Sequence, residues 1–133
     1  MKIELFYIGK PRSRPANQLV AEYAQRLGRY CRIEIKEIRS ERGAPATKAL
    51  RIALDPLGEQ PTSEEFARWI ESAGRDMAFY IGGADGWSDA FRTSADRLLS
   101  LGRMTLPHEL ARVVLAEQLY RAFTILRGHP YPR

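Results

Sequence analysis

A short apolar run in the second half of the chain, from Met77 to Ile81, stops abruptly at Gly82-Gly83. An unbroken apolar run of this length between turn residues predicts a strand that is buried on both faces. Ser88 then offers a good N-cap for a helix that begins at Asp89. In open parallel sheets, ligands bind at the carboxyl ends of such strands. An isolated glycine pair is more often an ordinary tight turn, so the pattern alone does not establish a ligand site.

The rest of the chain alternates between segments with the apolar pattern of strands and segments with the apolar pattern of helices. Strands are predicted at residues 2–8, 32–38 and 50–54 and near residues 101–106, and helices at residues 15–30, after Thr62, after Ser88, and from about His108 to Arg127. Thr62 and Glu65 have the spacing of a capping box. Alternation of this kind predicts an α/β fold, with a mostly parallel sheet and helices on both faces. We expect residues 1–133 to form a single domain.

The last predicted helix is apolar on nearly all sides. Glu117, Arg121 and Thr124 leave only a narrow polar stripe on it. A helix with this pattern is buried on nearly all sides. One side can pack on the sheet, and we expect the other to pack on a second copy of the chain, with Leu119 as the partner-facing position.

The positive charge is concentrated in the first part of the chain. Residues 1–51 hold 12 Lys and Arg against 5 Asp and Glu, whereas residues 52–133 hold 9 against 11. Seventeen of the 21 basic residues are arginine, which forms forked contacts with phosphate. A basic half of this kind suits a nucleic-acid partner, although a solvated basic face would give the same composition.

Few residues suggest metal or disulfide chemistry. Cys31 is the single cysteine, and His108 and His129 are far apart in the sequence. We therefore expect no disulfide framework and no metal site. The N-terminal segment, with Glu4 in a very short apolar run, fits neither a signal peptide nor a membrane span, so we expect a cytoplasmic protein with no membrane partner.

Several motifs together resemble the RlmH family of SPOUT-class methyltransferases, which act on large-subunit ribosomal RNA. They are Ile81-Gly82-Gly83-Ala84-Asp85-Gly86, Met104-Thr105-Leu106-Pro107-His108, the run from Arg112 to Ala122, and Gly128-His129-Pro130-Tyr131, together with Ile8-Gly9-Lys10 near the start. The resemblance extends over nearly the whole chain. It implies a homodimer, a C-terminal trefoil knot and an S-adenosylmethionine site. It also implies methylation of N3 of a pseudouridine in 23S ribosomal RNA of the assembled ribosome.

The resemblance places the methyl donor on one group of residues: Leu54, Gly82, Leu101, Gly102, Arg103, Met104, Thr105 and Leu106. Elementary chemistry agrees with that placement. Gly82 would let the backbone approach the ligand, and Leu101, Met104 and Leu106 would supply apolar walls for adenine.

The proposed reaction needs a group that favours the deprotonated base, because N3 of a uracil-type ring carries a proton at neutral pH. Arg121 and Arg133 are the candidate cations, and His129 and Tyr131 complete the candidate catalytic set. From the residues alone, an ion pair between Arg121 and Glu117 is the simpler interpretation. His108 is expected to be a structural first-turn residue, and Trp87 is compatible with either base stacking or core packing.

Two departures from the family pattern bear on function. The chain passes from Pro45 to Leu50 almost directly, where the family usually has an extra helix, and it ends Tyr131-Pro132-Arg133, where the family commonly has a histidine before the last residue. Pro132 supports an alternative, namely a catalytically impaired ribosome-binding or assembly factor. A different nucleotide-binding domain is disfavoured, because the chain has neither a G-x-G-x-x-G spacing nor a P-loop lysine motif.

Overall fold

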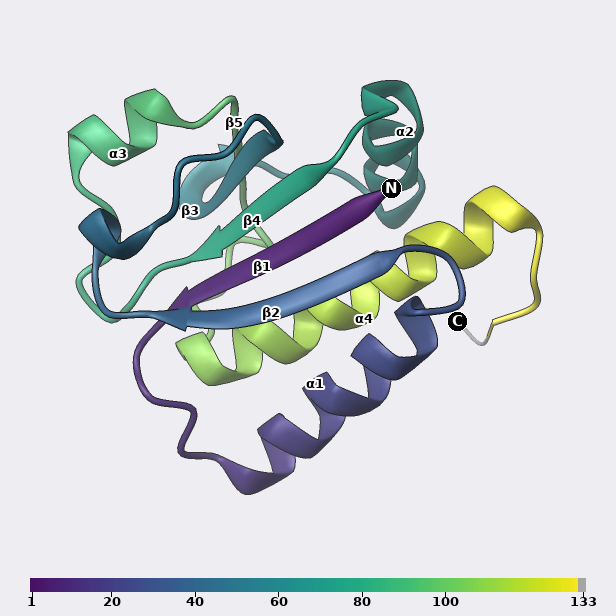
Figure 1. The fold of residues 1–133 in the computed structure, drawn as a ribbon, viewed down its shortest axis with the longest axis horizontal. Helices are drawn as coiled ribbons and strands as arrows, with labels where there is room; N and C mark the ends of the chain where they lie inside the picture. The colour runs from purple at the N-terminus through teal and green to yellow at the C-terminus, as the bar shows by residue number, and fades with distance from the viewer. Residues whose placement is uncertain (132–133) are drawn as a thin grey trace.

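The computed structural model describes residues 1–131 and shows a five-stranded, all-parallel sheet with the strand order β2-β1-β4-β3-β5 (Figure 1). The elements follow one another as β1 (Lys2–Ile8), α1 (Arg14–Leu27), β2 (Arg32–Ile38), the 3₁₀ turn η1 (Glu41–Gly43), β3 (Leu50–Glu59), α2 (Ser63–Ala73), β4 (Met77–Ile81), α3 (Asp89–Ser94), β5 (Arg97–Leu99) and α4 (His108–Arg127). The predicted α/β class and parallel sheet are confirmed.

Helices cover both faces of the sheet, as predicted. Alternate side chains of β1 and β4, such as Leu5 and Phe79, point to one face of the sheet and pack in the larger core with α2 and α4. Side chains of the other parity, such as Phe6 and Tyr80, pack with Phe91 of α3 on the opposite face. All five residues of β4 are buried, which confirms the two-sided burial expected of the central strand.

The predicted helix boundaries are confirmed where capping residues mark them. The Thr62 hydroxyl accepts a hydrogen bond from the Glu65 backbone N–H at 3.1 Å, and the Glu65 carboxylate accepts one from the Thr62 N–H at 2.9 Å. Ser88 caps α3 through the Phe91 N–H. The final helix ends at Gly128. Local capping therefore sets the start of α2 and α3 and fixes the loops that precede them.

Two predicted strands differ from the structure. The strand expected near residues 101–106 is wrong: the fifth strand is β5, and residues 100–107 form an irregular connection to α4. The third strand extends beyond the expected Leu54, since both Leu54 and Glu59 align with Leu99 and the residues between them bulge out of the ladder. Both differences occur at the carboxyl edge of the sheet.

The partner-facing assignment of Leu119 is also wrong. Leu119 is fully buried in the larger core, whereas Leu110 and Ile125 are the large apolar side chains of α4 that remain 46% and 40% exposed. The exposed stripe of α4 therefore lies on a different side of the helix, where Leu110 and Ile125 are exposed and Val114, Gln118 and Arg121 between them are half-buried.

Candidate functional site

A cavity of about 480 Å³ lies at the carboxyl ends of β3 and β4, beside the start of α4. Its volume falls within the range of about 300–1,000 Å³ that is typical of small-molecule sites. The structure brings all eight predicted donor-binding residues to its walls, namely Leu54, Gly82, Leu101, Gly102, Arg103, Met104, Thr105 and Leu106. They come from three segments that are far apart in the sequence. The eight residues therefore lie together at one place, which we call the donor cavity after the ligand that the resemblance implies for them.

Gly82 lines the donor cavity for a different reason from the one expected. A Cβ at Gly82 would lie 3.2 Å from the indole Cε2 of Trp87, so the space beside this glycine is filled by the protein itself. Trp87 is buried, and its Nε1 donates a hydrogen bond to the Leu54 carbonyl at 2.9 Å. The ring also stacks on Phe91 with a centroid distance of 4.2 Å. Trp87 is thus a core residue that supports the cavity, which resolves the choice left open by the sequence in favour of packing.

The connection from β5 to α4 forms the apolar wall. The Ser100 hydroxyl, itself buried, donates to the Gly102 carbonyl at 2.8 Å and lies 3.2 Å from the Gly102 N–H, which shapes a tight turn. Beyond the turn, Met104 is 86% exposed. An apolar side chain left in water beside a cavity is available for a ligand surface.

One residue of the cavity wall was missed in the sequence. Asp55 is buried, and its carboxylate pairs with Arg92 of α3 at 3.0 Å and accepts the Leu57 N–H at 2.8 Å. Removal of one partner from a buried ion pair is strongly destabilising. The pair therefore holds the bulge after Leu54 in place. The position of Asp55 directly after a buried strand was the available signal.

A second cavity, of about 700 Å³, lies at the other end of α4 and collects the described catalytic candidates. Arg121, His129 and Tyr131 all line it, together with Gln118 and Thr124. The predicted residue Arg133, and Pro132 beside it, lie outside the described residues. We call this second site the tail cavity.

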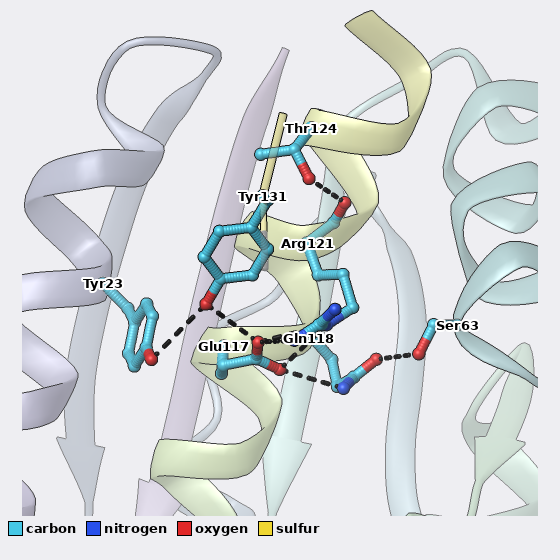
Figure 2. A network of polar contacts seen from close by, with 7 residues as sticks. All are labelled: Tyr23, Ser63, Glu117, Gln118, Arg121, Thr124 and Tyr131. Carbon is cyan, nitrogen blue, oxygen red and sulfur yellow. Dashed lines mark hydrogen bonds and ion pairs between the residues drawn. The ribbon is translucent and has the colours of Figure 1, made fainter. Parts of the chain in front are cut away.

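Glu117 is the centre of a network of polar contacts that includes Arg121, Gln118 and Tyr131 of the tail cavity (Figure 2). Its carboxylate pairs with the Arg121 guanidinium at 2.7 Å, and it accepts hydrogen bonds from the Tyr131 hydroxyl at 3.0 Å and the Gln118 amide at 2.9 Å. The Tyr131 oxygen also lies 3.5 Å from that of Tyr23 on α1. The intrahelical pair that was the simpler interpretation of Arg121 is therefore present, and it forms part of a larger network that ties the C-terminal segment to α4 and α1.

The charges in this network are well defined. Burial and the hydrogen bonds to Tyr23 and Glu117 raise the pKa of the Tyr131 phenol, so it remains protonated at neutral pH. Hydrogen bonding to Glu117 raises the pKa of Arg121. Tyr131 therefore acts as a hydrogen-bond donor here, and Arg121 remains a cation.

His129 is held at the same end of the molecule. Its Nδ1 is hydrogen-bonded to the Tyr30 hydroxyl, and its backbone N–H donates to the Thr124 carbonyl at 2.9 Å. His108, by contrast, occupies the first turn of α4 and lines the donor cavity, so the two histidines lie at opposite ends of the helix.

The two cavities are separated along α4. From His108 to Arg121 the helix axis advances about 20 Å, at roughly 1.5 Å per residue. A third cavity of about 270 Å³ lies between them and shares Leu101 with the donor cavity and Gln118 with the tail cavity. Within one chain the predicted donor residues and the described catalytic candidates therefore line two distinct but neighbouring cavities.

Residues 1–131 contain neither a metal-binding cluster nor a membrane-spanning helix. Within this range, no three His, Cys, Asp or Glu side chains are grouped in a way that could hold a metal ion. No helix in the same range is long and apolar enough to cross a membrane.

Comparison with known proteins gives a consistent result. The family model described as "Predicted SPOUT methyltransferase" matches residues 1–132. The chain is 50% identical to a protein of Solibacter usitatus named ribosomal RNA large subunit methyltransferase H, over 100% of both chains. It is 42% identical to a protein of the same name from Geobacter sulfurreducens, over 98% of this chain and 99% of the relative.

Solved structures show a similar fold at low sequence identity. A putative RNA methyltransferase of Bacillus anthracis superposes with a TM-score of 0.59 at 13% identity, covering 100% of both chains. The SpoU methyltransferase AviRb of Streptomyces viridochromogenes, solved in complex with AdoMet, gives a TM-score of 0.55 at 15% identity and covers 98% of this chain and 59% of that one.

Proposed function

Because the chain belongs to the RlmH family of SPOUT methyltransferases, we propose that it transfers a methyl group from S-adenosylmethionine to N3 of a pseudouridine in 23S ribosomal RNA of the assembled ribosome. The observation that carries this proposal is the donor cavity, which gathers every donor residue that the family resemblance implies. The reaction on the ribosome places the enzyme in the cytoplasm. The family also implies the C-terminal trefoil knot, which stays a prediction.

The donor cavity suits a nucleoside with a charged tail. Leu101, Met104 and Leu106 offer apolar surface for adenine, and the exposed residues Arg103 and Thr105 offer polar side chains on the same wall. When bound, S-adenosylmethionine supplies an electrophilic methyl group on a sulfonium centre.

The remaining chemistry is assigned to the tail cavity. The cation of Arg121 would stabilise the ring anion that forms when N3 loses its proton. Glu117 fixes the direction of that guanidinium, and Tyr131 keeps the C-terminal segment beside it. His129 and Arg133 complete the proposed set, with Arg133 as a second cation.

A homodimer would bring the two cavities together. Leu110, Val114 and Ile125 lie along one exposed stripe of α4, with Gln118 and Arg121 between them. A two-fold axis perpendicular to this stripe would pair two α4 helices in opposite directions, so that the start of one meets the end of the other. The donor cavity of one subunit would then face the tail cavity of its partner.

The alternative of a ribosome-binding factor without activity is not favoured, because the full-length relatives are named methyltransferases and the donor cavity is complete. The decisive experiment measures transfer of labelled methyl from S-adenosylmethionine to ribosomes from cells that lack this gene. Mass spectrometry of the product RNA then locates the new methyl group. We expect one methylated pseudouridine with the native chain and none with Leu106→Trp, which would fill the donor cavity. Ribosomes that bind the native chain without gaining a methyl group would favour the alternative.

A further inference from the structure

The basic loop, from Gly9 to the first residue of α1 at Arg14, presents three cations at alternate positions of the sequence. Lys10, Arg12 and Arg14 are exposed, whereas Pro11 and Ser13 between them are half-buried. Within residues 1–131 no hydrogen bond or ion pair is recorded for any of the three basic side chains. Lys10 and Arg12 lie before the helix, and Arg14 is the first residue of α1. The segment therefore presents three exposed cations that are not neutralised by the described part of the protein.

This basic loop is anchored at several points along its backbone. The Asn17 side chain donates to the Pro11 carbonyl at 2.8 Å, and the Ser13 N–H donates to the Glu109 carboxylate at 2.7 Å. At Gly9, which has a φ of 108°, a Cβ would lie 3.2 Å from Nε2 of His108, so the backbone lies close against the first turn of α4. The anchors come from α1 and α4, and they leave the basic side chains outside.

A buried arginine joins these anchors. Arg112 is only 2% exposed, and its Nη2 donates to the Asn17 side chain at 2.9 Å and lies 3.5 Å from the Glu109 carboxylate. Its guanidinium also lies 4.7 Å from the ring centre of Tyr7, whereas its Nε has no hydrogen-bond partner within residues 1–131. Burying a cation is costly, so a buried arginine needs the compensation that these partners give. The arrangement ties β1, α1 and α4 together directly beneath the basic loop.

The basic loop also borders the donor cavity. His108, against which Gly9 packs, is part of the cavity wall, and Ile8 lies beside Gly83, which is another wall residue. The carboxyl ends of the neighbouring strands β1 and β4 therefore place the start of the basic loop at the edge of the donor cavity.

We propose that Lys10, Arg12 and Arg14 form a preorganised docking surface for the phosphate backbone of the RNA substrate, an inference that rests on the proposed function. Arginine and lysine contacts to phosphate position a nucleic acid without reading its sequence. Because the loop is already fixed, little conformational entropy is lost when it binds. The loop has no aromatic or large aliphatic residue, which an anionic membrane surface would favour.

The test compares three variants in their binding to ribosomes that lack the modification, over a range of KCl concentrations. The first is Lys10→Gln/Arg12→Gln/Arg14→Gln. The matched control is Arg29→Gln/Arg32→Gln/Lys48→Gln, which removes the same charge at the opposite edge of the sheet. The third is Asn17→Ala, which keeps all three cations and removes both the anchor to Pro11 and the hydrogen bond from Arg112, so thermal unfolding checks that this variant is folded. Calorimetry with S-adenosylmethionine checks that each donor cavity remains intact.

We expect the loop triple variant to bind ribosomes at least tenfold more weakly and to lower the slope of log K against log salt by about two, since each phosphate contact contributes roughly 0.7–0.9. The control should stay within about threefold of the native chain, and Asn17→Ala should bind more weakly with an unchanged slope.

Equal losses in the loop and control variants would overturn the docking surface, and native binding by Asn17→Ala would overturn its preorganisation. A loop variant that loses affinity for anionic phospholipid vesicles but not for ribosomes would also overturn it. Failure of the proposed function would look different, because the native chain itself would then transfer no methyl group.

Discussion

Trp87 lies against Gly82 so closely that a Cβ at Gly82 would come within 3.2 Å of the indole. A valine there would push the indole away from Phe91 and from the Leu54 carbonyl. We expect Gly82→Val to lower the melting temperature by several degrees, because overpacking a core contact costs about 1–3 kcal/mol. Affinity for S-adenosylmethionine should fall at the same time.

Leu106→Trp tests the donor cavity without changing the hydrophobic core. Leu106 is a half-buried wall residue outside the core clusters, so we expect a loss of at least tenfold in donor affinity with little change in melting temperature. Leu19→Trp on α1, away from the cavity, is the control. The measurements are calorimetry with S-adenosylmethionine and thermal unfolding. If Leu106→Trp bound S-adenosylmethionine as tightly as the native chain, the donor cavity would not be the binding site.

Leu110 and Ile125 are the positions that we expect to favour association in the proposed homodimer. The native chain should sediment with twice the chain mass at micromolar concentration. Leu110→Glu/Ile125→Glu should give a folded monomer, because charges on an exposed apolar stripe oppose its burial without disturbing the core. Leu119→Glu should instead unfold the chain, since Leu119 is fully buried. A native chain that sediments as a stable monomer would contradict the assignment.

Complementation tests whether each reaction uses two subunits. Leu106→Trp should disable the donor cavity and Arg121→Ala the tail cavity, and each variant alone should be inactive. If the two are unfolded and refolded together, half of the dimers contain one chain of each kind and one intact composite site. The mixture should then recover about a quarter of the native activity. No recovery would indicate that both functions belong to one chain.

The carboxyl edge of the sheet was the part of the fold that the sequence predicted least well. Strong local signals, such as the apolar run from Met77 to Ile81 and the Thr62 capping box, predicted their elements correctly because each is determined within a few residues. The segment from Leu101 to Leu106 looks like a strand, yet it forms a cavity wall in which Met104 faces solvent. The periodicity of a sequence cannot distinguish an apolar residue that lines a ligand site from one that packs in the hydrophobic core.

Contacts between distant segments were also beyond prediction. The network around Glu117 requires Tyr23 of α1 to meet Tyr131, and the Arg112 contacts join three elements. Only the family resemblance grouped the donor residues before the structure was known. The pattern of a single sequence does not indicate which loops lie side by side. The side that α4 turns to solvent likewise depends on how it packs against α1 and α2, which is why Leu119 was assigned wrongly.

Acid should weaken the contact between η1 and α3. The Glu41 carboxylate accepts hydrogen bonds from the Ser88 hydroxyl and N–H at 2.6 and 2.7 Å, and these lower the pKa of Glu41 below its ordinary value. A carboxylate with a lowered pKa in the folded state contributes stability above the unfolded pKa of about 4.3, and that contribution is lost as the pH falls through the folded value. Glu41→Gln should therefore melt below the native chain at pH 7, and the difference should shrink below about pH 4.3.

The control for this pH dependence is Glu71→Gln, which removes an exposed carboxylate of α2 that has no recorded partner within residues 1–131. Its melting temperature should follow that of the native chain across the same range. A constant difference between Glu41→Gln and the native chain down to pH 3 would show that the Ser88 contact does not depend on the carboxylate charge.

The last prediction concerns the tail, where Pro132 stands in place of the family's histidine and offers neither a proton acceptor nor a backbone donor. An essential general base is typically worth about 10²–10⁴ in rate. If the histidine had that role, the native chain would be at least ~100-fold slower than Pro132→His in methyl transfer to unmodified ribosomes. We expect instead a difference of less than about tenfold, because Arg121 stays cationic beside Glu117 and can stabilise the ring anion while water accepts the proton. Activity only in Pro132→His, with donor affinity equal in both chains, would make the histidine the proton acceptor and would favour the ribosome-binding factor over the enzyme.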